Sequence, residues 1–397
     1  MLSFLRKIIL LLSFFFKLKI LRKNNYDIVI FDIESKFDLD YLLKEKKKIF
    51  YLADRNEHFN KIFLSNRIFK NFFKFFDGNL KRSYQAALIE TMCPKIVLTF
   101  IDTNWRFGEL AKIFSKSQIK FIAIQNGAKF TFQEYKELFE KGIIKENVNQ
   151  KLFIPNILTL SEYEQELSKI YKIKINNFQN VGSLRLYNFY HYKKFIKKQK
   201  IEFSKLPTYD LAILSDYNGW DQRLGIDYTK KILETLNTII EIVIRNKLNC
   251  VFLYKATKKN LIKREKEHSL YKNGLYKNNF DFISNKIIER NSRFGTYEIL
   301  LKTNLLIGTI STLLRENIAL GGKSLACNQT PKNIYDFPIN GICNIKNFNP
   351  EELEQRILYL LQISRKNYSK TLGSNKDYVC NTNYKKTKKL ILQNLNI

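Results

Sequence analysis

The chain has 397 residues, of which 45% are hydrophobic and 14% aromatic, so it can build large cores and is not a disordered protein. Its 68 Lys and Arg against 37 Asp and Glu give a net charge of +31, which favours an anionic neighbour such as a membrane surface. The same chain is rich in Asn, Ile, Phe and Tyr, as AT-rich codons would produce, so the charge does not by itself indicate nucleic acid. Three His and five scattered Cys residues argue against a zinc site and fit a reduced cytosolic protein.

The first segment of the chain, residues 1–25, is apolar and basic. Its longest uninterrupted apolar run, residues 8–16, would be only about 14 Å long as a helix, whereas a bilayer core is about 30 Å thick. No small-x-small cleavage site follows, so a signal peptide is not indicated. Two interpretations stay open. The segment is either an interfacial anchor on anionic head groups or an ordinary buried first helix.

Residues 26–190 predict a first α/β domain. Short apolar runs predict buried parallel strands, because both of their faces are apolar; they lie at residues 26–32, 49–52, 96–101, 121–124 and 157–160. Helical patterns separate them at residues 80–92, 107–115 and 161–171. Strands that alternate with helices indicate βαβ units and a parallel sheet.

Residues 209–380 repeat this organisation. Strands are predicted at residues 209–216, 250–254, 280–283, 305–307 and 324–326, and helices at residues 228–245, 258–271, 296–301 and 312–319. The basic stretch 191–208 is predicted to be the linker, and residues 381–397 a terminal helix. The expected fold is α/β with two Rossmann-like domains, whose ligands bind beyond the carboxyl ends of the strands.

The most informative segment is residues 305–328, LLIGTISTLLRENIALGGKSLACN. An apolar strand runs into a turn at residues 308–312 and then into a helix, and the N–H groups and hydroxyls of such a helix start can hold a phosphate. Thr312 and Glu316 lie on one face of this helix. A carboxylate there would accept hydrogen bonds from ribose hydroxyls rather than approach the phosphate. The competing interpretation is a plain helix cap formed by Ser311.

This segment resembles the donor-nucleotide region of GT-B glycosyltransferases and, more narrowly, that of bacterial surface-carbohydrate biosynthesis proteins. The similarity lies in the order strand, G-x-x-S-T, helix with Glu, and Gly-rich turn into Lys. The resemblance implies a GT-B architecture with an interdomain cleft, in which Ser311 and Thr312 contact the donor's phosphates and Glu316 its ribose. The expected donor site also takes in Gly308, Thr309, Arg315 and Lys255.

Residues 94–129 carry a second likeness. A strand is followed by Asp102 and Asn104, then a helix, then a strand that ends in Gln125 and Asn126 before a glycine turn. Proteins of the surface-carbohydrate type have a similar iDxN…IQNG pair in the domain that faces the acceptor. Asp102 is therefore the first candidate for the base that deprotonates an acceptor hydroxyl. A helix cap and simple turn residues are the competing interpretation. Further acceptor-side candidates, in the loop after residue 52, are Asp54 and His58.

The first strand of the second half ends in a loop that is expected to border the cleft. Its candidates are Asp216, Trp220 and Arg223, with a structural loop role as the alternative. No cluster of Asp residues suggests a divalent metal, which agrees with the metal-independent habit of GT-B enzymes.

The resemblance therefore implies a glycosyltransferase of capsule or lipopolysaccharide synthesis, which would move a sugar from a nucleotide-activated donor to a cell-surface glycan or lipid-linked acceptor. It is expected to be cytoplasmic, to be peripheral on the inner face of the cell membrane if its first segment is an anchor, and to use neither a cofactor nor nucleic acid. Two alternatives stay open: a sugar-nucleotide epimerase of the same architecture, and a non-catalytic protein that binds membranes or polyanions.

Overall fold

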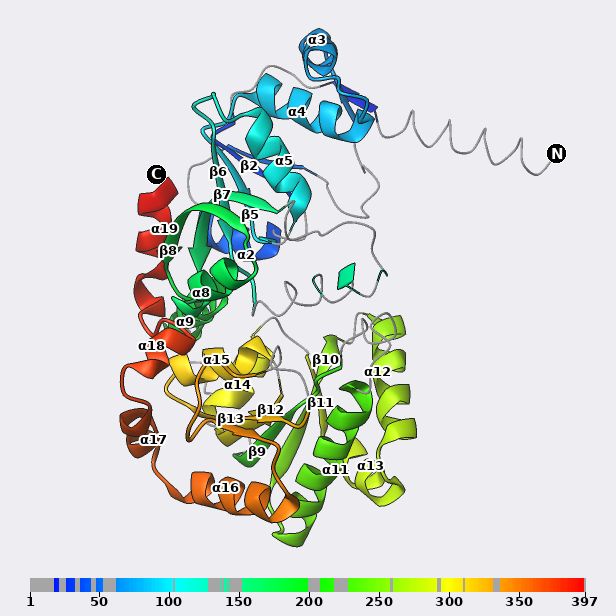
Figure 1. Ribbon diagram of the computed structural model, residues 1–397, viewed down its shortest axis with the longest axis vertical. Helices are drawn as coiled ribbons and strands as arrows, with labels where there is room; N and C mark the ends of the chain where they lie inside the picture. Colours follow the sequence, from blue (N-terminus) through cyan, green and yellow to red (C-terminus); the bar gives the residue numbers. More distant parts are fainter. Residues whose placement is uncertain are drawn as a thin grey trace, which may run out of the picture.

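The chain folds around two parallel sheets of six strands each (Figure 1). A computed structural model describes residues 18–20, 26–32, 36–43, 48–52, 62–102, 104–127, 136, 139–140, 142, 152–198, 208–217, 228–257, 260–290, 294–309, 311–330 and 336–395. All strand pairs that it records within the two sheets are parallel. The predicted α/β fold with two Rossmann-like domains is confirmed.

The first sheet has the order β3-β2-β5-β6-β7-β8. Its strands are β2 (Ile28–Ile30), β3 (Ile49–Tyr51), β5 (Ile96–Thr99), β6 (Lys120–Ile124), β7 (Phe153–Thr159) and β8 (Lys174–Asn180). The helices of this domain are α2 (Lys36–Leu43), α3 (Asn66–Lys74), α4 (Leu80–Met92), α5 (Trp105–Ile113), α8 (Tyr163–Ile170) and α9 (Leu184–Lys198). A separate pair of short parallel strands, β1 (Leu18–Ile20) and β4 (Ile62–Leu64), lies beside α3 at the tip of the domain (Figure 1).

The two faces of this sheet build two cores, which explains why its strands are apolar on both sides. In β2, Ile28 and Ile30 belong to one core, whereas Val29 and the next residue after the strand, Phe31, belong to the other. Side chains of α4 and α5 pack into the core of Val29, and side chains of α2 and α9 pack into the core of Ile28.

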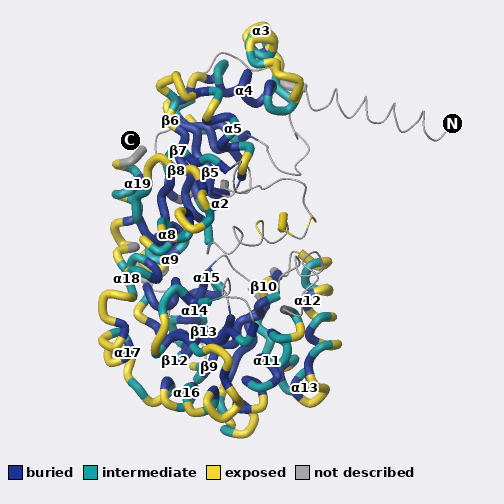
Figure 2. The backbone as a smooth tube through the Cα atoms, viewed as in Figure 1, coloured by how far each residue is buried: buried dark blue, intermediate teal, exposed yellow. Residues whose placement is uncertain are grey.

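The second sheet has the order β11-β10-β9-β12-β13-β14. Its strands are β9 (Tyr209–Leu214), β10 (Cys250–Thr257), β11 (Ile287–Arg290), β12 (Thr303–Gly308), β13 (Lys323–Asn328) and β14 (Asn344–Lys346). Its helices are α11 (Tyr228–Arg245), α12 (Leu261–Gly274), α13 (Lys277–Ser284), α14 (Gly295–Leu301), α15 (Thr312–Ala319), α16 (Pro350–Gln362), α17 (Arg365–Leu372) and α18 (Asn375–Val379). Figure 2 shows that the buried backbone is concentrated in the two sheets and the faces of the helices that cover them.

The end of the described chain returns to the first domain. After α18 and a short 3-10 helix, η4 (Tyr384–Lys386), helix α19 (Thr387–Leu395) runs beside α9 (Figure 1). The side chain of Ile391 is fully buried in the core of Ile28, and the Thr387 hydroxyl donates a hydrogen bond to the carbonyl of Val181 at 2.6 Å. The expected terminal helix therefore completes a core that begins near the other end of the chain.

Some elements differ from the sequence expectation. Residues 280–283, expected as a strand, lie in helix α13, and the strand is the following β11. The buried side chains of α13 are Asn279 and Ile283, one helical turn apart, and so short an apolar run does not distinguish a strand from a helix. Residues 191–198 of the expected linker form the second half of α9, and residues 199–207 lie outside the described part of the chain.

Candidate functional site

The turn between β12 and α15 is held by a carboxylate of the neighbouring strand. The backbone N–H of Thr309 donates to Oδ2 of Asp216 at 2.6 Å, and both residues are buried. Asp216 follows β9, which pairs with β12 through Ile213 and Ile307. Asp216, expected as a lining residue, thus lies at the predicted donor turn and fixes its shape.

Gly308 is required by the packing of the same two strands. A Cβ at this position would lie 2.9 Å from Cβ of Leu214, closer than two such atoms approach. The absence of a side chain therefore lets the turn start directly beside β9, and any larger residue would push the strands apart.

Ser311 is the cap of α15, as the plain structural interpretation predicts. Its Oγ accepts a hydrogen bond from the N–H of Leu313 at 3.3 Å. This contact uses the hydroxyl as an acceptor and leaves its proton for another group. Ser311 can therefore cap the helix and still donate to a phosphate oxygen.

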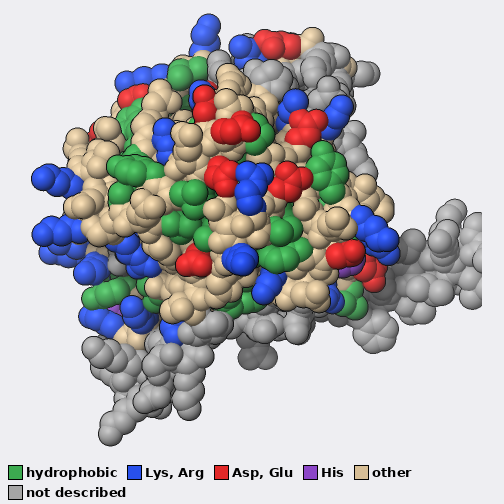
Figure 3. Space-filling view, turned by 90° about the horizontal axis from the view of Figure 1, so that it is seen from below, with side chains coloured by type: hydrophobic (Ala, Val, Ile, Leu, Met, Phe, Trp, Pro, Cys, Tyr) green, Lys and Arg blue, Asp and Glu red, His purple; other side chains and the backbone are tan. Residues whose placement is uncertain are grey.

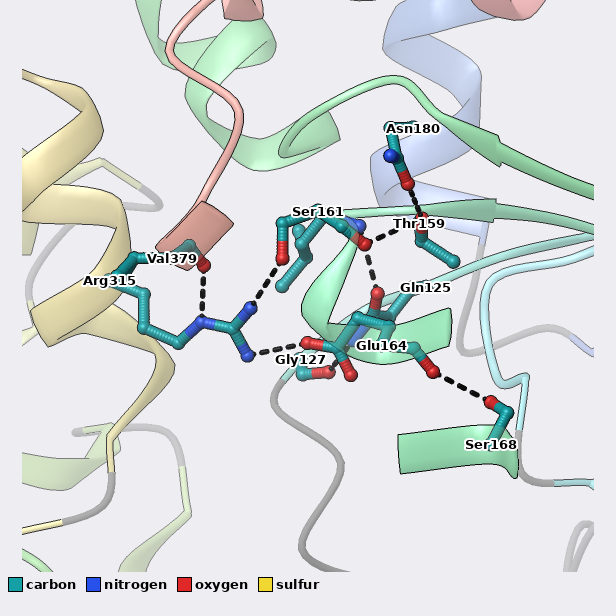
Figure 4. A network of polar contacts seen from close by, with 10 residues as sticks. Gln125, Gly127, Thr159, Ser161, Glu164, Ser168, Asn180, Arg315 and Val379 are labelled. Atoms are coloured by element: carbon teal, nitrogen blue, oxygen red, sulfur yellow. Dashed lines mark hydrogen bonds and ion pairs between the residues drawn. The ribbon is translucent and has the colours of Figure 1, made fainter. Parts of the chain in front are cut away.

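The first domain meets this helix start through its own predicted motif. A Cβ built on Gly127 would lie 3.1 Å from Oγ1 of Thr312, so the loop after β6 lies directly against the N-terminus of α15. Gln125 shapes that loop: its Nε2 donates to the carbonyl of Gly127 at 2.7 Å, and its Oε1 accepts from the N–H of Leu160 at 2.9 Å (Figure 4). The structure thus brings together two segments that are far apart in the sequence, one from each domain.

Gln125 and Asn126 differ in their surroundings. Gln125 is buried and holds the turn, as expected if it is a turn residue. Asn126 is partly exposed at the same turn. Of the two, Asn126 is the side chain that an incoming molecule can reach.

Glu316, the expected ribose ligand, is buried among protein hydroxyls. Oε1 accepts from the hydroxyl of Ser183, in the first domain, at 2.6 Å, and Oε2 accepts from the hydroxyl of Tyr297 at 2.8 Å. Burial raises the pKa of Glu316, while the charge of Arg185 and the two hydrogen bonds oppose the rise. Each carboxylate oxygen can accept a further hydrogen bond, but only 2% of Glu316 is exposed to solvent.

Arg315 also serves the contact between the domains. Its Nη1 lies 2.5 Å from Oε1 of Glu164, its Nη2 donates to Ser161 at 3.1 Å, and its Nε donates to the carbonyl of Val379 at 2.7 Å (Figure 4). The side chains of Arg315 and Glu164 are 3% and 1% exposed. Arg315 was expected to help hold a phosphate; in the structure its guanidinium ties α15 to α8 of the first domain and to α18.

The expected base and its neighbour lie at the carboxyl end of the first sheet. Asp102 is 3% exposed and follows β5, while Asn104 caps α5 by accepting a hydrogen bond from the N–H of Arg106 at 3.1 Å. The hydroxyl of Thr99, the last residue of β5, donates to the buried carboxylate of Asp32 at 2.5 Å. Two carboxylates therefore follow neighbouring strands at this edge.

The other predicted residues are less informative. Lys255 is exposed at β10, and its backbone N–H donates to the buried carboxylate of Glu267 at 2.8 Å. Within the described ranges, no group of His, Cys, Asp and Glu side chains could hold a metal ion. Four candidates lie outside the described residues: Asp54, His58, Trp220 and Arg223.

The sequence did not single out the first-domain partners of α15. Ser161, Glu164 and Ser183 are all buried, and each contacts a side chain of α15 from more than a hundred positions away. A Glu in an otherwise ordinary helix and two Ser residues after strands give no local signal. Only the fold shows that they face α15.

No protein-family model matches the sequence, and no curated protein matches it. Solved structures match it in fold. The UDP-GlcNAc 2-epimerase of Methanocaldococcus jannaschii, in complex with UDP-GlcNAc and UDP, is similar with a TM-score of 0.53 and 14% identity over 93% of this chain and 98% of that one. Anabaena HepE, in complex with UDP and glucose, has a TM-score of 0.52 and 10% identity over 94% and 100%. The glycotransferase of kitacinnamycin has a TM-score of 0.50 and 11% identity over 94% and 99%.

These comparisons show the fold. The chain has the two-domain GT-B architecture along nearly its whole length. Among the residues that the structure describes, no helix is both long and apolar enough to cross a membrane.

Proposed function

We propose that the protein binds a nucleotide sugar between its two domains and transfers the sugar to an acceptor, as a glycosyltransferase. The observation that supports this most strongly is the meeting of both domains at the start of α15, where Gly127 lies beside Thr312 and Asp216 holds the preceding turn. The N-terminal end of a helix carries partial positive charge and free N–H groups. Such an end stabilises the diphosphate that leaves during glycosyl transfer.

The residues have separate roles in this proposal. The hydroxyls of Ser311 and Thr312 donate to the donor's phosphates. Asp102 takes the proton of the acceptor hydroxyl as it attacks the sugar carbon, and no resident cofactor is needed. The acceptor is a cell-surface glycan or a lipid-linked precursor, so the enzyme works on the cytoplasmic side. Two solved structures of this fold hold UDP together with glucose or with UDP-GlcNAc, which makes a UDP-sugar the first donor to test.

A sugar-nucleotide 2-epimerase is the second candidate. It is favoured by the likeness to the Methanocaldococcus jannaschii epimerase, whose TM-score of 0.53 is at least as high as the 0.50 of the kitacinnamycin glycotransferase. An epimerase would invert one carbon of the bound sugar, whereas a transferase releases the nucleotide when the acceptor is present. The two reactions therefore leave different products from the same donor.

Binding is tested by calorimetry with UDP and UDP-GlcNAc on Ser311→Ala and on a matched control, Ser364→Ala. Both serines cap a helix of the second domain, since Ser364 Oγ accepts from the N–H of Asn367 at 3.1 Å. Both variants should lose about 1 kcal/mol of stability from the lost cap. Only Ser311→Ala should also lose affinity, by roughly 10- to 150-fold, because a hydrogen bond to an ionised phosphate is removed.

Equal affinity of the two variants for the nucleotide would refute the phosphate site. The activity is then assigned by product analysis with UDP-GlcNAc. Release of UDP that depends on a glycan acceptor supports the transferase. Conversion of the sugar without release of UDP shows the epimerase instead.

A further inference from the structure

The tip of the first domain exposes a ridge of aromatic side chains. Helix α3 and the residues after it present Phe69, Phe73 and Phe76, which are 66%, 61% and 52% exposed. The tip lies at the end of the molecule opposite the second domain (Figures 1 and 2). Exposed apolar side chains that are gathered into one patch often mark a surface that binds a protein or a membrane.

The fold of α3 does not need this ridge. Its other face packs on α4: Ile68 is buried, Phe72 and Phe75 are partly buried against the same core, and the Asn71 amide donates to the Thr91 hydroxyl at 3.0 Å. Phe69 and Phe73 follow the spacing i, i+4, which places them on one line along the helix surface. Phe76 follows the end of the helix, and its ring contacts that of Phe72 with centroids 5.7 Å apart. The rings of Phe69 and Phe73 contact each other edge to face, with centroids 4.8 Å apart.

Two aliphatic side chains of the neighbouring strand pair extend the ridge. Ile20 of β1 pairs with Leu64 of β4, and both are exposed. Because Leu18 begins β1, the apolar and basic residues 1–17 join the chain at this same end of the molecule. The segment for which the sequence leaves open an interfacial anchor or a buried first helix is therefore attached next to the aromatic ridge.

The charge around the ridge is positive. Residues 62–82 contain five Lys or Arg residues and a single Asp, and Arg67, Lys70 and Lys74 are exposed on α3. By helical spacing these three cations lie along one flank of the line of Phe69 and Phe73. Of the three, Lys74 forms an ion pair with Glu90 of α4 at 2.7 Å. The opposite end of the molecule differs: Figure 3 shows basic and acidic side chains interspersed on the face seen there, with hydrophobic side chains scattered among them.

We propose that this tip is a membrane-contact site, in which Phe69, Phe73 and Phe76 enter the acyl boundary of an anionic bilayer while Arg67 and Lys70 meet its head groups. Helix α3 lies at the outer end of the domain rather than between other elements (Figure 1), so a flat lipid surface can reach the whole ridge. Apolar side chains flanked by cations are the combination that binds anionic interfaces. This proposal does not depend on the activity proposed above.

The first test measures sedimentation of the full-length protein with vesicles of phosphatidylcholine alone or mixed with phosphatidylglycerol. The triple variant Phe69→Ser, Phe73→Ser, Phe76→Ser should bind the mixed vesicles at least about tenfold more weakly, because three apolar side chains are removed from the lipid. The matched control, Leu261→Ser with Ile262→Ser, removes side chains of α12 that are 60% and 71% exposed, and should bind like the parent. Circular dichroism confirms that each variant is folded.

The charge is tested separately. Arg67→Gln with Lys70→Gln should weaken binding to the mixed vesicles several-fold and leave binding to phosphatidylcholine unchanged, and added salt should reduce the difference. The control changes two exposed cations of the second domain, Lys272→Gln with Lys277→Gln. Equal loss in both pairs would show that only the net charge matters and would overturn the assignment of these residues.

The second test asks whether the ridge itself enters the lipid. Phe73→Trp and, as a control, Ile262→Trp are mixed with vesicles whose acyl chains carry bromine, and quenching is compared with the background of the two native Trp residues. Only Phe73→Trp should be quenched further. If the protein sediments with the vesicles but Phe73→Trp is not quenched, residues 1–17 alone hold the membrane and the proposal is wrong. A parent dimer that the triple variant turns into a monomer, with unchanged lipid binding, would assign the ridge to a second copy of the chain.

Discussion

Arg315→Met tests whether the buried pair between α15 and α8 holds the two domains together. The pair is almost fully buried, with 3% and 1% of the two side chains exposed, so the change leaves the Glu164 carboxylate without its charged partner in a poorly solvated place. Removing one partner of such a pair costs about 3–5 kcal/mol of the free energy of unfolding. The loss is measured by urea denaturation followed by Trp fluorescence and circular dichroism, since two domains can unfold in separate steps.

The double variant, Arg315→Met with Glu164→Leu, separates charge from packing. It removes both charges, so it should recover most of the lost free energy of unfolding. A loss of about 1–3 kcal/mol should remain, because Ser161 and the carbonyl of Val379 no longer receive the hydrogen bonds of Arg315. The control Lys231→Met breaks an exposed ion pair, that of Lys231 with Glu234, in which the two side chains are 42% and 43% exposed. This change should lower the free energy of unfolding by less than about 1 kcal/mol. A single variant that loses no more than this control, or a double variant no more stable than the single one, would refute the assignment.

Three further changes test the site. Burial raises the pKa of Glu316 in the folded chain. The free energy of unfolding should therefore fall more steeply for the parent than for Glu316→Gln as pH rises from below about 4.5 towards neutrality. The free energy is measured by denaturant titration at each pH, and an equal dependence on pH in the two proteins would contradict this. Gly308→Ala should cost about 1–3 kcal/mol, measured by thermal and chemical unfolding, because its Cβ would lie 2.9 Å from that of Leu214. Asp102→Asn should lower the rate of sugar transfer without changing nucleotide affinity, and full activity would remove Asp102 as the base.

The sequence predicts those helices and strands whose own apolar residues show which of their faces are buried. Apolar runs identify β2, β5 and β12 because both faces of these strands are covered, and helical spacing predicts α4, α11 and α15 with the bounds that the structure has. Strand β8 was missed because its sequence, KINNFQN, is polar. Within the part of the chain that the structure describes, it pairs with β7 alone, at the edge of the sheet.

The candidate site was predictable only in part. The segments around Gln125 and Ser311 are recognisable because strand ends and helix starts have local signatures, and the structure brings them together. Contacts such as that between Ser183 and Glu316 join residues 133 positions apart. No local pattern encodes which residue of one domain faces which residue of the other. The contacts of Glu316 and Arg315 with the first domain could therefore not be predicted from their own segment.

The return of α19 to the first domain affects how the protein forms on the ribosome. Domains usually fold in order as they emerge during synthesis, but the first core of this chain includes the fully buried Ile391, from an element that follows the whole second domain. Until residues 387–395 have emerged, the hydrophobic face that α19 covers stays open to water or to a chaperone. The first domain therefore begins to fold before the second but completes its core after it.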